Sequence, residues 1–252
     1  MNSCRWCEKP AIVSHIIPAA LNRFMKKRDK AYTVRELDNP NLALQDFLKL
    51  PLLCSKHDGM FSQAEDKFVS EIFRPLQSGV TRFTYDQWFG QIAVFMAWKR
   101  LETCKPFDNV TVDEVLMINK ALSHWEGLLL GKHADLEPYQ HYFFLTKLIA
   151  SSDLKEFEHL ILNENFGSSV LISQDNVYVI TLMPGCMFVS PLSPDSIFDG
   201  GSGVKIEPSG EFNDNQIIPG SFLRTWLQRQ VKECMASREL VSSKQWAKIT
   251  KP

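Results

Sequence analysis

The sequence lacks the long apolar run that a membrane-spanning helix requires. No stretch of its 252 residues approaches the ~18 apolar residues of a span. The most apolar early stretch, residues 11–21, is interrupted by Ser14, His15 and Pro18, which argues against the core of a signal peptide. These absences predict a cytoplasmic protein with no membrane partner.

Cysteine is scarce as well. Six cysteines in a chain of this length are too few for a disulfide scaffold, which is typical of small secreted domains. Cys104, Cys186 and Cys234 each lie in apolar surroundings, which predicts buried, inert thiols. The other three, Cys4, Cys7 and Cys54, are better explained by a metal site than by disulfides.

Several familiar enzyme motifs are missing. The sequence contains no Walker loop, no GxGxxG and no GxSxG, which excludes a P-loop, a dinucleotide-binding fingerprint and a nucleophile elbow of the usual form. A globally disordered chain is excluded too, because 44% of the residues are hydrophobic and 11% are aromatic, as in ordinary folded proteins.

The net charge of −1 conceals an uneven distribution. Residues 1–60 hold ten Lys and Arg against six Asp and Glu, whereas residues 61–252 hold eighteen against twenty-three. Most of the positive excess forms one basic segment: Arg23, Lys26, Lys27, Arg28, Lys30 and Arg35. Such a segment predicts a phosphate-binding surface for nucleic acid, and a merely solvated face is the alternative.

The chain is predicted to be of the α+β class, with two domains. The first domain is predicted to cover residues 1–75. Its first sixty residues are punctuated by proline and irregular, so they need a staple to fold, and the cysteines suggest a metal. Residues 76–252 are predicted to form a helical and antiparallel-β domain, which suits a sensor, a protein-binding part or a homo-oligomer contact. The predicted helices cover residues 84–102, 110–131, 219 onward and 244–249, and the predicted strands cover 139–149, 169–173 and 177–183.

Local signals refine this outline. Ser62 with Glu65, and Thr111 with Glu114, have the spacing of capping boxes at helix starts. Pro75 is predicted to end the helix that begins at Ser62. The stretch from 193 to 216, rich in Ser, Pro, Asp and Gly, is predicted to be a surface loop.

Two short knuckles supply the donors for a metal. Cys4 and Cys7 form a C-x2-C motif, and Cys54 and His57 form a C-x2-H motif later in the chain. Zinc prefers four tetrahedral thiolate and imidazole ligands, at ~2.3 Å and ~2.0–2.1 Å respectively. The sequence therefore predicts a closed, structural Zn²⁺ site.

Between the knuckles lies the run Ser14-His15-Ile16-Ile17-Pro18. This run, placed between two zinc knuckles, resembles the HNH or ββα-metal nuclease family over about residues 1–73. The resemblance implies a zinc-stapled ββα-metal or treble-clef-like module that hydrolyses phosphodiester bonds in DNA and, in a prokaryote, acts in defence against phage. It implies His15 as general base and Asp58 as ligand of a catalytic Mg²⁺ or Mn²⁺.

The sequence departs from the family pattern at Ser14, Lys49 and Asp58, where the family usually has an acidic residue, Asn and His. A second hypothesis is therefore a catalytically inactive, zinc-stapled module that binds nucleic acid or protein. Its individual alternatives are a His15 that is only a core residue, an Asp58 that caps a helix, and a Glu65 that completes a cap rather than joining Asp58 at a metal.

Overall fold

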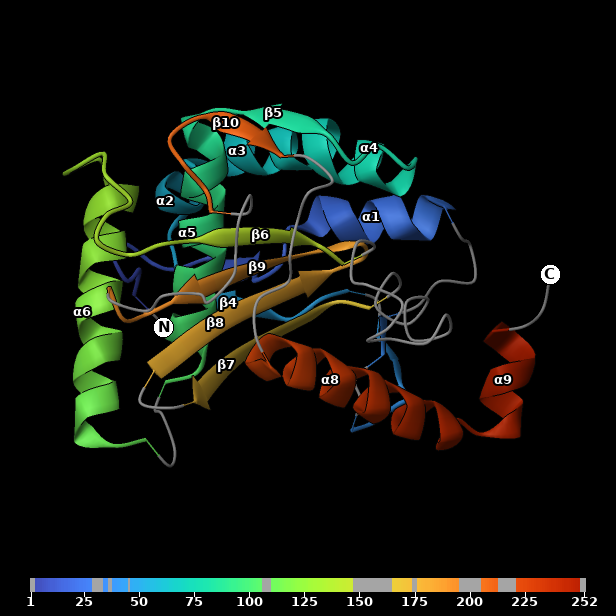
Figure 1. Cartoon of the computed structure of the whole chain (residues 1–252). Coiled ribbons are helices and arrows are strands. Elements are labelled where there is room, and N and C mark those ends of the chain that lie inside the picture. The colour runs from blue at the N-terminus through green and yellow to red at the C-terminus, as the bar shows by residue number, and fades with distance from the viewer. Residues whose placement is uncertain are drawn as a thin grey trace. The chain divides into compact units, whose positions relative to one another are not determined.

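The computed structural model describes residues 3–28, 34–35, 38–44, 46–105, 110–146, 165–173, 176–194, 205–212 and 221–249. Helices combine with antiparallel strands, so the predicted α+β class is confirmed (Figure 1). The chain folds as two compact units, Met1–Cys54 with Thr225–Pro252, and Ser55–Arg224. Compactness does not test independent folding, so the domain boundary at residue 75 stays a prediction.

The described part of the first unit contains short strands and helices: β1 (Val13–His15), α1 (Ala19–Arg28), β2 (Val34–Arg35), β3 (Ala43–Leu44), β4 (Lys49–Pro51), α8 (Ser221–Glu239, from Thr225 onward) and α9 (Ser243–Ile249). Strand β1 pairs antiparallel with β4, and β2 pairs with β3. Helix α1 follows Pro18 and buries Leu21 and Met25, an i, i+4 pair that forms one face of the helix.

The C-terminal helices belong with the N-terminal strands. The Asn41 amide donates to the Leu240 carbonyl at 2.9 Å, and its oxygen accepts from the Ser242 amide at 2.8 Å. The Arg35 guanidinium donates to Gln245 at 3.4 Å. Asn41 thus holds the turn between the end of α8 and the start of α9. These long-range bonds tie the C-terminal helices to the N-terminal segment of the same unit.

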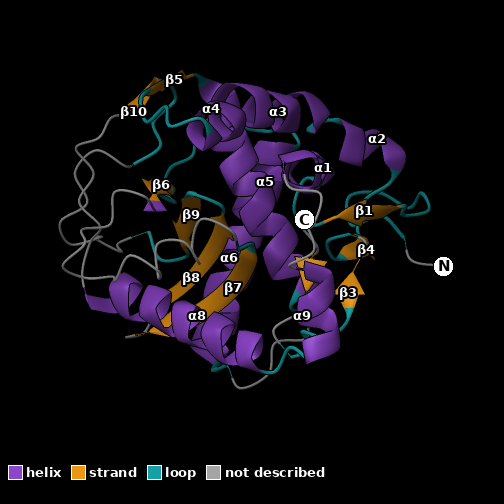
Figure 2. Cartoon of the chain, turned by 90° about the vertical axis from the view of Figure 1, so that its right-hand side faces the viewer, coloured by secondary structure: helices purple, strands orange, loops and turns teal. Residues whose placement is uncertain are grey.

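The second unit holds the remaining elements: α2 (Ser55–Gly59), α3 (Ser62–Lys67), the π-helix η1 (Phe68–Phe73), α4 (Arg74–Gln77), β5 (Phe83–Tyr85), α5 (Gln87–Thr103), α6 (Val112–Leu129), β6 (Tyr142–Leu145), β7 (Gly167–Ser173), β8 (Asn176–Met183), β9 (Cys186–Pro191) and β10 (Gly210–Phe212). Its main sheet has the order β6-β9-β8-β7, with antiparallel neighbours throughout. Helix α5 packs against this sheet and against α6 (Figure 2).

The core of the second unit is aromatic. Phe89 of α5 packs edge-on against Phe143 and Phe212, with ring centroids 5.2 Å apart in both pairs. Such edge-to-face pairs add to the stabilisation that burial alone provides. Because α5 is covered on several sides, its sequence is apolar almost all round, which is the property that predicted a buried helix.

Two helix starts turned out differently. The Thr111–Glu114 capping box is confirmed, with reciprocal bonds of 3.3 and 2.6 Å. The Ser62–Glu65 box is wrong, because the α3 cap is Phe61 and the Ser62 hydroxyl donates to the Gly59 carbonyl instead. Pro75 does not end the run, because it stands in α4, which continues directly from the π-helix η1.

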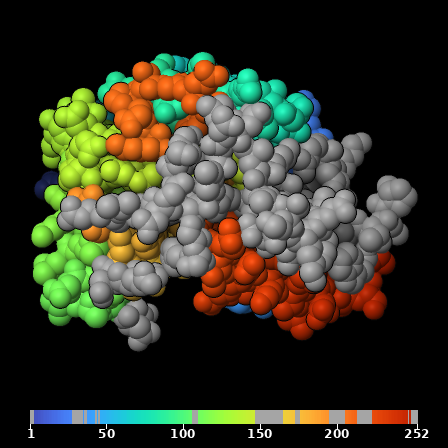
Figure 3. All heavy atoms as spheres, viewed as in Figure 1, coloured from blue at the N-terminus to red at the C-terminus, as the bar shows by residue number. Residues whose placement is uncertain are grey.

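The predicted hairpin is confirmed, with Ser173 opposite Asn176 across β7 and β8. The next turn joins β8 to β9 through Gly185, whose φ of 84° suits glycine. The predicted loop at 193–216 lies partly outside the described residues, and its described part contains β10. Figure 3 shows this orange segment against the teal surface around β5, with which it pairs.

We predict an acid-sensitive second unit from its buried histidine. Burial lowers the pKa of His141 to about 3, with His124 adding to the effect, and its Nδ1 lies 2.7 Å from the Ser190 hydroxyl. An unfolded His has a pKa of about 6.5. Between about pH 6.5 and 3 the unfolded chain therefore binds a proton at this histidine, whereas the folded chain keeps it neutral. Stability therefore falls as the pH drops from about 6.5 toward 3, by up to about 1.4 kcal/mol per pH unit.

Thermal melting at pH 7 and pH 5 checks this prediction. His141→Asn keeps a polar atom near Ser190 but does not titrate, so its melting temperature should fall less between the two pH values. Burial also lowers the pKa of His124, which leaves a residual slope in the variant. Equal slopes in wild type and variant would show that His141 does not carry the effect.

Candidate functional site

The two knuckles meet. One donor atom from each of Cys4, Cys7, Cys54 and His57 lies within 4.8 Å of all the others, and the sulfurs of Cys7 and Cys54 are 3.8 Å apart. Two thiolates bound at ~2.3 Å to a tetrahedral zinc would stand ~3.8 Å from each other. This donor set could hold a metal ion such as zinc, and all four donors are protein side chains.

Backbone bonds bring the knuckles together. The first knuckle closes through the Cys4 amide, which donates to the Lys9 carbonyl at 2.9 Å. The Arg5 and Ile12 amides then donate to the carbonyls of residues 52 and 53, at 2.9 and 2.8 Å. Because Cys54 directly follows that stretch, these backbone hydrogen bonds place its sulfur near those of Cys4 and Cys7.

The thiol cluster favours a bound cation. The backbone amide of Lys9 lowers the pKa of Cys7, but desolvation and the neighbouring sulfurs of Cys4 and Cys54 outweigh it and raise the pKa above the ordinary value. Three crowded thiols resist ionising together without a positive charge between them. A metal ion supplies that charge and deprotonates its thiol ligands.

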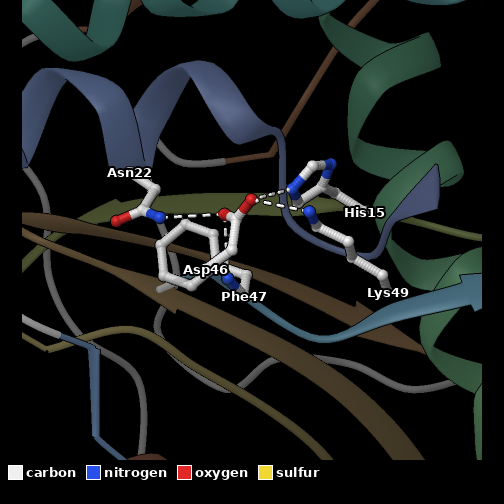
Figure 4. Close-up of polar contacts among 5 residues, drawn as sticks. All are labelled: His15, Asn22, Asp46, Phe47 and Lys49. Atoms are coloured by element: carbon white, nitrogen blue, oxygen red, sulfur yellow. Dashed lines mark hydrogen bonds and ion pairs between the residues drawn. The ribbon is translucent and has the colours of Figure 1, made fainter. Parts of the chain in front are cut away.

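The second feature is a hydrogen-bonded pair of His15 and Asp46 within the first unit (Figure 4). The β1–β4 register sets His15 opposite Lys49. Asp46 lies three residues before Lys49, and its Oδ2 is 2.7 Å from His15 Nε2 and 2.9 Å from Lys49 Nζ. Its Oδ1 accepts from Asn22 of α1 at 2.8 Å and from the Phe47 amide at 3.0 Å.

These contacts fix the charge of Asp46 and indicate which nitrogen of His15 donates. Burial raises the pKa of Asp46, but the bonds from His15, Lys49, Asn22 and the Phe47 amide together lower it well below the usual range. The carboxylate is therefore ionised at neutral pH and can only accept hydrogen bonds. His15 Nε2 must then donate, and in the neutral imidazole this leaves the lone pair on Nδ1. The His15 side chain is 23% exposed, so part of the ring is accessible to solvent.

Sequence reasoning missed Asp46. The family pattern directs attention to position 49, where Lys stands, and Asp46 lies outside that spacing. One signal was available, because Asp46 is the only acidic residue between positions 39 and 57. Its partner on α1, Asn22, is 24 positions away, a distance that sequence periodicity does not reveal.

Asp58 has different surroundings, all within the second unit. Its Oδ1 lies 3.9 Å from Lys99 Nζ of α5, and Lys99 is also 3.4 Å from Glu65 Oε1. Burial raises the pKa of Glu65, the Lys99 charge opposes this, and the net shift is upward. Asp58 and Glu65 thus share an ammonium.

A catalytic Mg²⁺ or Mn²⁺ does not fit these surroundings. Mg²⁺ in proteins keeps several waters and needs only one or two carboxylates, but here the ammonium of Lys99 already lies within 3.9 Å of both Asp58 and Glu65. Its positive charge repels a second cation at these carboxylates. Among the described residues, the Cys4, Cys7, Cys54 and His57 group is the one set of three or more donors that could hold a metal ion.

The basic segment is divided. On α1, Arg23 and Lys27 are exposed and Lys26 is half-buried, so the first two extend from the face opposite Leu21 and Met25. The Arg28 side chain and Lys30 lie outside the described part of the chain. Arg35 donates to the Pro40 carbonyl at 2.5 Å and to Gln245, so its guanidinium makes hydrogen bonds within the protein.

Comparison of the chain with protein-family models, curated proteins and solved structures gives no match. Among the described helices, none combines the length and the hydropathy needed to cross a bilayer.

Proposed function

We propose that the protein is a DNA-hydrolysing nuclease of the HNH type, in which zinc is structural and His15 is the general base. The observation that carries this proposal is the short hydrogen bond between His15 and the ionised Asp46. Further support comes from the antiparallel pairing of β1 with β4 and from α2, the next element after β4 in the chain, because paired strands followed by a helix resemble a ββα-metal module.

The pair suits proton abstraction from water. The Nδ1 lone pair of His15 takes a proton from a water molecule whose oxygen attacks the phosphorus, and the departing oxygen gains a proton from solvent. Asp46 holds the ring's orientation and stabilises the imidazolium that forms, as carboxylates do in other His-based sites. The zinc ligands hold β1 near β4 and so keep the pair assembled.

The exposed face of α1 lies in the same unit as His15 and suits a phosphate backbone. Reversing the charge of Arg23, Lys26 and Lys27 to Glu should weaken DNA binding and flatten its dependence on salt, because fewer counterions are released. Each lost phosphate contact should reduce the slope of log K against log salt by about 0.9 for duplex DNA.

Binding isotherms at several salt concentrations check this prediction. A matched control reverses three exposed lysines elsewhere, Lys120, Lys132 and Lys232, and so makes the same change in net charge. The control should keep the salt slope of the wild type. If both triple variants flatten the slope equally, DNA responds to overall charge and α1 is only a solvated face.

A nicking assay tests the proposed activity. Zinc-loaded wild-type protein is incubated with supercoiled plasmid, linear duplex and single-stranded DNA, with and without Mg²⁺ or Mn²⁺. The proposal expects relaxed or shortened products from at least one substrate. DNA that is bound but never cut under any of these conditions would contradict it.

The second candidate function is a zinc-stapled binding module without catalysis. The specific observation in its favour is Lys99, whose ammonium lies beside Asp58 where the resemblance implies a catalytic cation. For such a module, His15→Ala would lower the melting temperature, and wild-type protein would bind DNA or protein without cleaving DNA.

A further inference from the structure

Lys99 is an unusual lysine. Its side chain is only 3% exposed, although lysine is almost never fully buried unless its charge is paired. The ammonium lies over the Phe95 ring, 4.0 Å from its centroid, and within ion-pair distance of Glu65 and Asp58. Three groups from α2, α3 and α5 therefore surround one buried positive charge.

The carboxylates are less buried than the lysine. The side chains of Asp58 and Glu65 are 27% and 25% exposed, so both reach the surface, whereas the lysine does not. Removing an ammonium from water is costly, and the cost is met only where opposite charges or a ring face replace its hydration. The negative charges of Asp58 and Glu65 are thus paired with a positive charge of the chain itself, the Lys99 ammonium.

We infer that Lys99 is a built-in cation that takes the place of a divalent metal ion beside Asp58. The inference rests on the proposed function only in naming that position as the family's metal site. The ammonium is attached to α5, whose neighbouring residues are buried, so a dissolved cation cannot displace it without moving the lysine out of the core.

Two consequences distinguish this arrangement from a metal site. The zinc-loaded wild type should bind no second divalent ion at Asp58. Lys99→Met, which keeps an unbranched apolar stem against Phe95, should leave two adjacent carboxylates without a counter-charge. Such a pair of hard oxygen donors attracts Mn²⁺, so the variant should acquire a site that the wild type lacks.

The first experiment is a Mn²⁺ titration of zinc-loaded wild type and Asp58→Asn, followed by the electron paramagnetic resonance signal of free Mn²⁺. The inference expects the same titration for both proteins, with no ion bound at micromolar concentration. One Mn²⁺ bound per wild-type chain and lost in Asp58→Asn would overturn it. This result does not depend on whether Lys99→Met folds.

The second experiment measures the melting temperature of Lys99→Met with and without millimolar Mn²⁺. We expect a fall of about 10 °C without the ion and partial recovery with it, because a ligand of the native state stabilises that state. The double variant Lys99→Met with Glu65→Gln should recover less. A Lys99→Met protein that melts like the wild type and ignores Mn²⁺ would contradict the inference.

Neither measurement involves DNA. If the nicking assay is negative while the wild type binds no second ion, the proposed function fails and the role of Lys99 stands. If DNA is cleaved but Mn²⁺ binds at Asp58 of the wild type, the proposed function stands and the role of Lys99 fails.

Discussion

Replacing His15 by Ala is expected to lower the single-turnover rate of DNA cleavage by about 10²–10⁴-fold, which is the usual contribution of a general base. The fold, the zinc content and the affinity for DNA should stay close to those of the wild type. The reason is position, because His15 is not one of the four candidate metal donors and its ring is partly open to solvent.

Asp46→Asn should reproduce much of this loss. The amide keeps the shape of the carboxylate but cannot hold the imidazolium by charge, and a misplaced or mis-protonated ring should cost about 10²-fold in rate. Asp38→Asn, which changes an exposed acid in the same unit, is the matched control and should leave the rate unchanged. Cleavage by His15→Ala at the wild-type rate would remove His15 from the chemistry.

Removing one zinc ligand should have the largest effect on stability. Wild-type protein purified without chelator should carry one zinc per chain by elemental analysis. Cys54→Ser should lose that zinc and destabilise the first unit by several kcal/mol, because the site assembles only as the chain folds. Cys54 is also buried. A serine hydroxyl there would not replace the thiolate as a metal ligand.

Hydrogen exchange localises this effect. Amides in residues 3–28 and 46–54 should lose protection in Cys54→Ser, while those of the main sheet in the second unit keep theirs. Cys104→Ser, at a half-buried cysteine outside the cluster, is the control and should keep its zinc. Far less than half an equivalent of zinc in the wild type would rule the site out.

Local patterns in the sequence were sufficient for much of the fold. The Thr111–Glu114 box, the β7–β8 hairpin and the tail helix at 243–249 depend on residues within a few positions of one another. The four donors that could hold a metal ion were also predictable, since each knuckle is a local motif and four soft donors suit one metal ion.

Contacts between distant residues were beyond such reasoning. Glu65 has a helix-capping spacing, but its carboxylate faces Lys99, 34 positions later. Arg35 contacts Gln245 of α9, and Asn41 contacts Leu240 just before that helix, so both contacts join residues about two hundred positions apart. In each case a buried or long-range partner decided between two uses of one side chain, and the intervening sequence gives no sign of the partner.

Chemical rescue of His15→Ala by imidazole tests the central claim most directly. If His15 is the general base, neutral imidazole should enter the space left by the ring and raise the cleavage rate in proportion to its concentration, while the wild type and Asp38→Asn stay unaffected. Zinc content is measured in parallel, so that metal loss to imidazole is not mistaken for failure to rescue. A zinc-loaded His15→Ala protein whose cleavage is already equal to the wild type, or whose lost cleavage does not respond to imidazole at any concentration, would contradict the account.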